Sequence, residues 1–508
     1  MNFTVNTDTL TNLLAIAPAG LLVALIVVVI LLDVIWPESR RREIGLVAGL
    51  GLFLIALASV LIQPPSDPAQ QFVFGGVYRF DVMTQLFVTI TLVAAGIAVL
   101  ISLDAKGIGK RGEYYTVLLV ATLGAVIMSG GADLIVIFLG LETLSISLYC
   151  LAGFLRNSER SAEAGLKYFL FGSFTSAIML YGMSLLYGLT GYTNIYVIGQ
   201  RVVENYAATS GSVEFMIPII LSMLMIAVGF GFKVSAVPFH FWTPDVYEGA
   251  PTPVTAYISV ASKAASFAVL ARVFLAVFQN PQVEPLTIVT VQLVAIIAAV
   301  TMTLGNLLAL VQKNIKRLLA YSSIAQAGYA LIGVAAIAAN PGALVGAGTA
   351  AIGFYMAMYV LTNLAGFGVI ILFANATGSE EIKDFAGLGR RNFGLAMVMT
   401  IALLSLAGIP PAAGFVGKFF LFRAAVDANL TWLAIVGVLN SIVALYYYLV
   451  VIKVMFVDRS EDESKPIPVS MPYVVALGIS TIAVILIGTV LADPLFRWAI
   501  TAAQGLFS

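Results

Sequence analysis

Four ionisable side chains lie deep inside long apolar stretches, where a charge is costly. Glu142 is in DLIVIFLGLETLSISLY, Lys233 in VGFGFKVSAVPF, Lys263 in YISVASKAASFAV and Lys418 in GFVGKFFLFRAA. Charged groups at that depth in a membrane are rare and usually functional. An amine that can lose and regain a proton can carry protons, so these residues indicate proton transfer. The alternative, in which the charges only pair to hold helices together, is weaker because one glutamate cannot neutralise three lysines.

Lys167 and His240 could assist these four residues. Glu163 and Lys167 are four positions apart, which places them on one helical face in the favourable order. This spacing indicates an ion pair at a helix end or, alternatively, a Lys167 that points inward to Glu142 and tunes its pKa. His240, the only histidine, could relay protons near neutral pH or could be an ordinary hydrogen-bonded loop residue. A lone histidine cannot build a metal site.

Cofactor-binding patterns are not found in the sequence. The single cysteine, Cys150, lies in an apolar run, and we expect it to be a small packed hydrophobic residue. The sequence has no glycine-rich phosphate loop, cysteine cluster or nucleophilic triad. We therefore expect no metal, nucleotide, flavin or iron–sulfur centre in this chain, and any redox energy must come from other chains.

The elements that position these residues are membrane spans. Apolar residues make up 60% of the 508 residues and charged residues only 10%, so lipid must cover most of the surface. A net charge of zero argues against nucleic-acid binding. We expect an all-α polytopic membrane protein with about fourteen spans of roughly 20 residues or more. These spans lie near 11–36, 43–63, 79–103, 114–130, 132–154, 162–190, 214–238, 252–279, 285–311, 317–339, 343–376, 391–427, 429–457 and 470–502.

Lysine and arginine alternate between the two sets of loops. Cytoplasmic loops carry an excess of these residues, which predicts both termini on the non-cytoplasmic side. The outside loops carry little beyond Arg79 and Arg201. The predicted inside loops carry Arg40, Arg41, Arg42, Lys106, Lys110, Arg111, Arg156, Arg160, Lys313, Lys316, Arg317, Lys383, Arg390, Arg391, Arg459 and Lys465.

Prolines interrupt the seventh and twelfth spans, beside Lys233 and Lys418. Pro238 follows the first lysine, and Pro410 and Pro411 precede the second. Proline breaks or kinks a helix, and interrupted spans at matching positions indicate inverted repeats around a transport site. We predict repeats of five helices at 114–284 and 285–457, with a three-helix segment at 1–113 and a last helix in 458–508.

The tenth span, LLAYSSIAQAGYAL, has no acidic counterpart of the glutamate in the fifth span. Its Tyr321, Ser322, Ser323 and Gln326 form a polar stripe that could hold water. Small-residue helix packing explains the serines at least as well.

Five long stretches carry a family resemblance: FLGLETLSISLYCLAG, EAGLKYFLFGSFTSAIMLYG, FKVSAVPFHFWTPDVYEGAPTPVTAYISVASKAASF, KRLLAYSSIAQAGY and LSLAGIPPAAGFVGKFFLF. With them, essentially the whole chain resembles the antiporter-like membrane subunits of respiratory complex I, the proton-pumping NADH-quinone oxidoreductase. The resemblance implies that Glu142 pairs with Lys233, that Lys263 connects, and that Lys418 ends a hydrated proton path. Subunits of multisubunit Na⁺/H⁺ antiporters are also similar, so the motifs leave the transported ion open.

The same resemblance implies the surroundings of the chain. Partners would be other membrane-arm subunits, namely the antiporter-like subunit M and the small subunits K and J. NADH, FMN, iron–sulfur clusters and quinone would be bound by partner subunits, and the membrane would be a bacterial plasma or thylakoid-type membrane. Lys418 argues against subunit M, which typically has a glutamate at this position. The absence of a lateral helix argues against subunit L.

Overall fold

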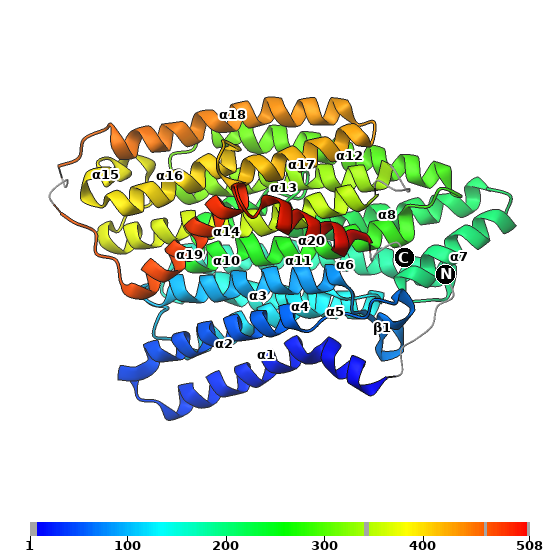
Figure 1. Ribbon diagram of the computed structural model, residues 1–508, viewed down its shortest axis with the longest axis horizontal. Helices are drawn as coiled ribbons and strands as arrows, with labels where there is room; N and C mark the ends of the chain where they lie inside the picture. The colour runs from blue at the N-terminus through cyan, green and yellow to red at the C-terminus, as the bar shows by residue number, and fades with distance from the viewer. Residues whose placement is uncertain (1–7, 340–344, 462–464, 505–508) are drawn as a thin grey trace.

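The computed structural model describes residues 8–339, 345–461 and 465–504, which form a helical bundle with one small hairpin (Figure 1). The α-helices of the first half are α1 Thr9–Ile35, α2 Arg41–Leu61, α3 Val82–Ser102, α4 Gly112–Ser129, α5 Leu134–Ala152, α6 Glu159–Thr190, α7 Ile195–Ala208, α8 Val213–Val234, α9 Trp242–Gly249, α10 Thr252–Tyr257 and α11 Lys263–Val273. The α-helices of the second half are α12 Glu284–Ala309, α13 Ile315–Ala339, α14 Val345–Thr377, α15 Leu388–Arg391, α16 Phe393–Ala407, α17 Ala413–Asp427, α18 Thr431–Phe456, α19 Met471–Gly488 and α20 Ala492–Gln504.

Short elements join or extend these helices. Strands β1 Phe72–Val73 and β2 Tyr78–Arg79 pair antiparallel. The 3₁₀ turns are η1 Glu38–Arg40, η2 Pro68–Gln70, η3 Phe74–Gly76 and η6 Ile382–Phe385. The π-helical turns η4 Ile258–Ser262 and η5 Phe274–Phe278 flank α11.

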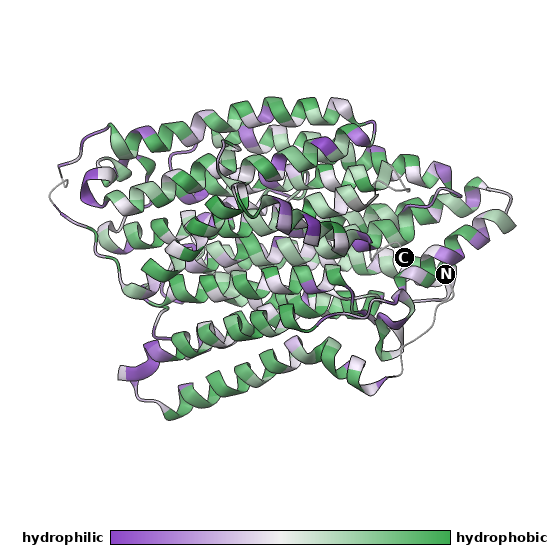
Figure 2. Ribbon diagram, viewed as in Figure 1, coloured by the Kyte–Doolittle hydropathy of each residue, from purple (hydrophilic) through white to green (hydrophobic). Residues whose placement is uncertain are grey.

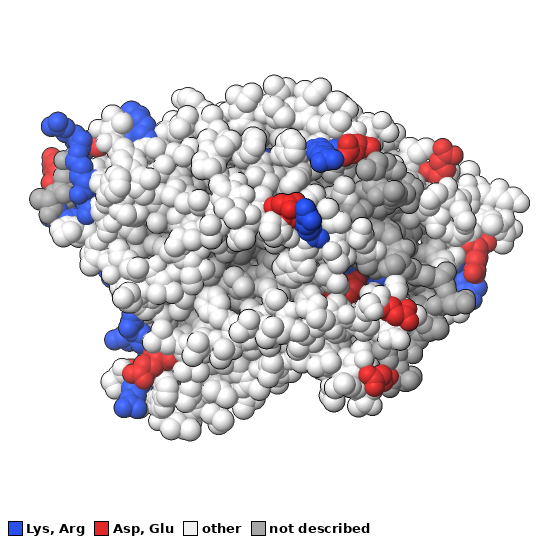
Figure 3. All heavy atoms as spheres, viewed as in Figure 1, with Lys and Arg blue, Asp and Glu red and all other residues white. Residues whose placement is uncertain are grey.

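The prediction of about fourteen spans is confirmed. Thirteen helices of the described residues are long and apolar enough to cross a membrane. The remaining span is the twelfth, predicted at 391–427, which is divided into α16 and α17 by the break at its prolines. Charged side chains gather towards the two ends of the bundle in Figure 3, and the surface between them carries only two small clusters in which opposite charges adjoin. Figure 2 shows the same helices coloured mainly as hydrophobic.

The centre of the bundle is formed by α14, α13 and the α10–α11 segment. Every residue in the most apolar stretch of α14 is buried, compared with about a third in α1 and α18. Helices α1 and α18 therefore form part of the outer surface, which lipid or partner chains must cover.

Two connections differ from the prediction. The segment 190–213, predicted to be a loop, contains α7, which is capped by the Asn194 side chain. The expected last span, 470–502, is two helices, because α19 ends at Gly488 and α20 begins at Ala492. Helix α20 carries the exposed ion pair Arg497–Asp493, which a lipid-facing helix centre would not tolerate.

Candidate functional site: a buried row of amines

Glu142 lies at the midpoint of α5 and is half-buried. Its Oε1 accepts a hydrogen bond of 2.6 Å from the Ser176 hydroxyl on α6. Leu139 and Ile146, on neighbouring turns of the same helix, are largely exposed. Glu142 therefore sits at the edge of the bundle rather than at its centre. Cys150, two turns further along, is also exposed, so the expectation that it packs in the interior is wrong for this chain.

Lys233 lies in the last turn of α8 and is only 3% exposed. Its Nζ donates to Ser145 Oγ at 2.5 Å and to Tyr149 Oη at 3.3 Å. Ser145 and Tyr149 follow Glu142 by about one and two turns on α5. The Lys233 amine thus contacts the face of α5 that also carries Glu142. Among the described residues, however, Lys233 and Glu142 do not form an ion pair within 4.0 Å.

The helix that carries Lys233 breaks directly after it. Ser235 takes the left-handed conformation, with φ of 65°, and the chain turns helical again at Trp242. The indole of Trp242 donates at 3.2 Å to the carbonyl of Phe232, which also accepts from the Ser235 backbone N–H. Such compensation is what a helix break inside a membrane requires.

His240 lies in this break and is half-buried. Within the described residues its Nδ1 has no hydrogen-bond partner. The hydrogen bonds of Lys233, Lys263 and Lys418 do not include His240 as a partner. The geometry therefore leaves open both interpretations of His240, as a relay and as a loop residue.

Lys263 begins α11, directly after the π-helical turn η4, and is 2% exposed. Its Nζ donates to the backbone oxygen of Ser323 at 2.7 Å and to Ser323 Oγ at 2.6 Å. The same hydroxyl lies 2.8 Å from Tyr359 Oη and 3.2 Å from Tyr247 Oη. Ser323 is therefore the centre of a hydroxyl cluster around this lysine.

The polar stripe of α13 continues from Ser323 towards the second helix break. Ser322 Oγ lies 2.5 Å from Tyr448 Oη, and Gln326 Nε2 donates to the backbone oxygen of Leu406 at 3.0 Å. The Tyr355 hydroxyl donates to Gln326 Oε1. These buried groups are hydrogen-bonded to helices α14, α16 and α18 rather than merely packed. Tyr321, the remaining member of the stripe, is half-buried.

Lys418 lies on α17, after the second break, and is 3% exposed. Its Nζ donates to the backbone oxygen of Ala407 at 3.1 Å and to Ser441 Oγ at 3.2 Å, and it lies 4.2 Å from the ring centre of Tyr329. Ala407 is the last residue of α16, so the broken helix supplies the acceptor.

Lys167 is placed away from Glu142. Its Nζ lies 2.7 Å from Glu163 Oε1, as the spacing of four residues indicated, and 2.7 Å from Asp245 Oδ2. Asp245 also pairs with Arg317 at 2.8 Å. Burial acts to raise the pKa of Asp245, but hydrogen bonds from Lys167 and Arg317 outweigh it and hold this pKa below its usual value. The alternative in which Lys167 turns towards Glu142 is not what the structure has.

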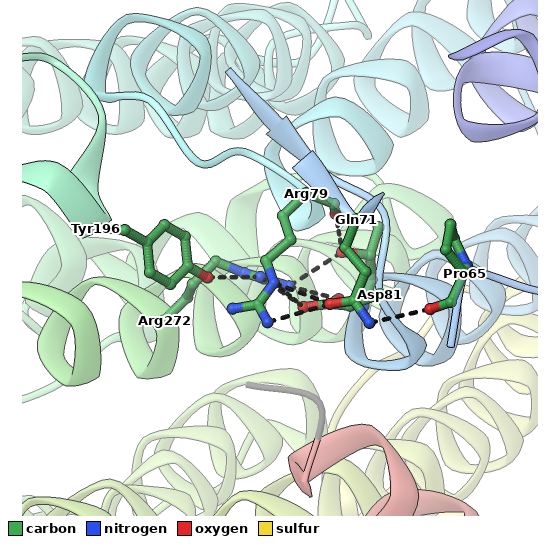
Figure 4. A network of polar contacts seen from close by, with 7 residues as sticks. Pro65, Gln71, Arg79, Asp81, Tyr196 and Arg272 are labelled. Atoms are coloured by element: carbon green, nitrogen blue, oxygen red, sulfur yellow. Dashed lines mark hydrogen bonds and ion pairs between the residues drawn. The ribbon is translucent and has the colours of Figure 1, made fainter. Parts of the chain in front are cut away.

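A second set of buried charges was not predicted from the sequence (Figure 4). Arg272 on α11 forms a two-point pair with Asp81, at 2.8 and 2.9 Å, and also donates to Tyr196 Oη. Arg79 lies 3.3 Å from the same carboxylate, and all three charged side chains are fully buried. The signal was present, because Arg272 interrupts the apolar run FAVLARVFLAVF as Lys263 interrupts its own.

Three of the buried lysine amines share one chemical environment, whereas Lys316 lies 3.1 Å from the Glu380 carboxylate. Lys233, Lys263 and Lys418 each donate to neutral oxygens, and in the described part of the chain none has a carboxylate within 4.0 Å. An unpaired ammonium group in such a site is not locked in its charged form, unlike the arginines beside Asp81. The described residues contain no group of three or more potential metal ligands.

Comparisons with known proteins agree on one family. The family described as "NADH:quinone oxidoreductase/Mrp antiporter, TM" matches residues 131–444. The chain is 43% identical to NADH-quinone oxidoreductase subunit N of Moorella thermoacetica over 94% of this chain and 95% of that one. It is 41% identical to the subunit N of Desulfitobacterium hafniense over 85% and 86% of the two chains.

Solved structures give the same result for the fold. A chain of respiratory complex I from Thermus thermophilus with bound aureothin is 30% identical, with a TM-score of 0.75, over 94% of this chain and 98% of that chain. The Mrp complex from Dietzia contains a chain with a TM-score of 0.79 at 20% identity, over 99% and 98% of the two chains. The latter likeness concerns the fold alone.

Proposed function

We propose a route for protons from the premise that this chain belongs to the family of NADH-quinone oxidoreductase subunit N. The chain is a proton-translocating, multi-pass subunit of the membrane arm of complex I. The resemblance inferred from the sequence motifs is thereby confirmed. Within this family, the geometry of the buried amines supports one particular order of proton transfer.

The route runs from Glu142 through Lys233 and Lys263 to Lys418. The observation that carries it is the row of three buried amines whose hydrogen-bond partners are neutral oxygens. Between Lys263 and Lys418 lie the buried hydroxyl and amide groups of α13 and their tyrosine partners. A proton that leaves one Nζ can enter a neighbouring oxygen while that oxygen releases its own proton onward.

The first step depends on the distance between Glu142 and Lys233. Ser145 and Tyr149 hold the amine in the described state, and Ser176 holds the carboxylate. A shift that brings the amine to the carboxylate would stabilise its charged form, and separation would favour release of the proton. Lys167 acts on this step at a distance, through its ion pair with Asp245. His240 is the relay candidate in the helix break that follows Lys233.

The repeat organisation and the sidedness belong to the same proposal. The interrupted helices α8–α9 and α16–α17 occupy corresponding positions in units 114–284 and 285–457, flanked by 1–113 and 458–508. The loops rich in lysine and arginine face the cytoplasm, and both termini face the other side of a bacterial plasma or thylakoid-type membrane.

Neighbouring subunits complete the path at its ends. Glu142 is half-buried at mid-membrane, and lipid alone would not stabilise the exposed part of its carboxylate. We place another membrane-arm subunit over α5 and α6 there, and the candidates are subunits M, K and J. NADH, FMN, iron–sulfur clusters and quinone are bound by other subunits, so this chain acts as a translocase without a redox centre of its own.

The test compares Lys263→Ala, Lys263→Arg and the exposed variant Lys383→Ala in the intact complex. We expect Lys263→Ala to lower proton pumping roughly tenfold or more while the complex still assembles. Lys263→Arg should not restore it, because guanidinium does not deprotonate in proteins. Pumping is measured in proteoliposomes with and without Na⁺, alongside the electron-transfer rate.

Lys383→Ala should pump like the unmodified complex, because Lys383 is an exposed residue of the 3₁₀ turn η6. Full pumping by Lys263→Arg would remove Lys263 from the route. Pumping that requires Na⁺ would instead favour a cation/proton antiporter subunit, the second interpretation of the motifs.

A further inference from the structure

Two adjoining hollows open at the end of the bundle that carries the basic loops. The larger, of about 230 Å³, lies between the turn 249–253, the start of α13 and the loop after α14. The smaller, of about 180 Å³, lies between α6 and α9. Arg160, Glu248 and Gly249 line both hollows, so the two share a wall.

Glu380 is held at the larger hollow by two helices of different halves of the chain. Its Oε1 lies 3.1 Å from Lys316 Nζ on α13 and accepts a 3.0 Å hydrogen bond from Thr252 Oγ1 on α10. Lys316 is 3% exposed and also donates to the backbone oxygen of Ala250. Glu380 is 22% exposed, so its carboxylate touches water on one side and a buried amine on the other.

Glu248, in the wall that the two hollows share, is also partly exposed and paired with a cation. Its Oε2 lies 3.0 Å from Arg317, and its side chain is 29% exposed. Asp245, which also lines the smaller hollow, is held by two cations and is the less suitable proton acceptor. Glu163 also lines the smaller hollow, but it is 62% exposed and pairs with Lys167 at the outer edge. Glu248 and Glu380 are the carboxylates of the larger hollow, and each has one ion-pair partner among the described residues and is partly open to solvent.

The helical segment that begins at the larger hollow carries Lys263. Thr252 begins α10, which continues through η4 to Lys263, a rise of roughly 16 Å for eleven residues. Tyr247 precedes Glu248 in α9, and its hydroxyl lies 3.2 Å from Ser323 Oγ, the group that binds Lys263. The Thr255 hydroxyl donates to the backbone oxygen of Tyr247 and lies on the same path.

We propose that these hollows are the mouth of proton uptake and that Glu248 and Glu380 collect the protons. The proposal rests on the proposed function, because it supplies protons to Lys263. A proton from cytoplasmic water binds one carboxylate and weakens its pair with Lys316 or Arg317. The carboxylic acid then releases the proton towards Tyr247 and Ser323, each hydroxyl accepting one proton and passing one on. The ion pair forms again when the amine of Lys263 has accepted the proton.

The test is the pH dependence of pumping by the intact complex carrying Glu248→Gln, Glu380→Gln or both. Proton uptake limits the pumping rate when protons are scarce. We therefore expect the variants to pump roughly tenfold more slowly than the unmodified complex at about pH 8, and the difference to become smaller towards about pH 6. Formate, a small weak acid that fits the hollow, should restore part of the loss. Glu113→Gln, an exposed carboxylate paired with Arg111 outside the hollows, should keep the unmodified profile.

A structural role would give a different result. An equal loss at every pH, without rescue by formate, would overturn the uptake role. If Glu380→Gln does not assemble because Lys316 is left unpaired, Glu380→Gln with Lys316→Met removes the buried charge, and the same pH profile is expected. Lys263→Ala should lose pumping at every pH. If it does while the glutamine variants keep the unmodified profile, only the uptake mouth is wrong. Full pumping by Lys263→Ala would remove the proposed route itself.

Discussion

The hydrogen bonding of the Lys263 amine depends on one neutral residue, Ser323. Its hydroxyl and its backbone oxygen both accept from Lys263, and two tyrosine hydroxyls lie within hydrogen-bond distance of the same Oγ. A carboxylate at this position would form an ion pair with the lysine and hold its charge. A serine stabilises the ammonium group less and can pass a proton on.

Replacement of Ser323 by alanine tests this view at the scale of one residue. We expect Ser323→Ala to lower pumping roughly tenfold, because a hydrogen bond to a charged group contributes about 1.5–3 kcal/mol. Ser266→Ala on the same helix as Lys263 is the matched control, since the buried Ser266 hydroxyl has no partner among the described residues. Equal pumping by the two variants, measured in proteoliposomes, would show that the Ser323 hydroxyl is not in the route.

The broken helices bring backbone oxygens to the amines. At the end of α16, Gly408 has φ of 88°, a left-handed conformation that ends the helix before Pro410. The carbonyl of Ala407 is thereby freed from the helix and accepts from Lys418. An unbroken helix would use this carbonyl internally and leave the lysine without it.

The glycine of this break is predicted to be required. A Cβ at Gly408 would lie 3.0 Å from Lys418 Cδ, and an L side chain is strained at this φ by about 1–2 kcal/mol. We expect Gly408→Ala to lower both the thermal stability of the complex and its pumping rate. Gly478→Ala, on α19 with open space around the added Cβ, should change neither. Unchanged pumping by Gly408→Ala would separate the break from the function of Lys418.

On the scale of the whole molecule, the cluster around Asp81 joins segments that are far apart in the chain. It connects the hairpin β1–β2, the start of α3, the last turn of α11 and α7 through Arg79, Arg272 and Tyr196. Guanidinium groups do not release protons in proteins, so the cluster serves to hold these elements together rather than to conduct.

Removal of the central carboxylate is therefore a prediction about stability. Asp81→Ala leaves Arg272 buried without its ion-pair partner, which costs about 3–5 kcal/mol. We expect a large fall in the unfolding temperature or failure to assemble. Asp493→Ala, which removes an exposed pair with Arg497 on α20, should cost no more than about 1 kcal/mol. Thermal denaturation of the two purified complexes measures the difference, and similar unfolding temperatures would contradict the role of Asp81.

Much of this protein was determined by local sequence alone. The number of spans, the two breaks and the positions of Lys233, Lys263 and Lys418 follow from apolar length, proline and the cost of a charge in lipid, all of which are read within one segment. The buried arginine of α11 could have been found by the same argument. Tertiary structure alone decided that Lys167 meets Asp245, that Ser145 accepts from Lys233, and that Ser323 binds Lys263. Those contacts join residues 60 to 88 positions apart, and only the packing of helices against one another fixes which polar groups meet.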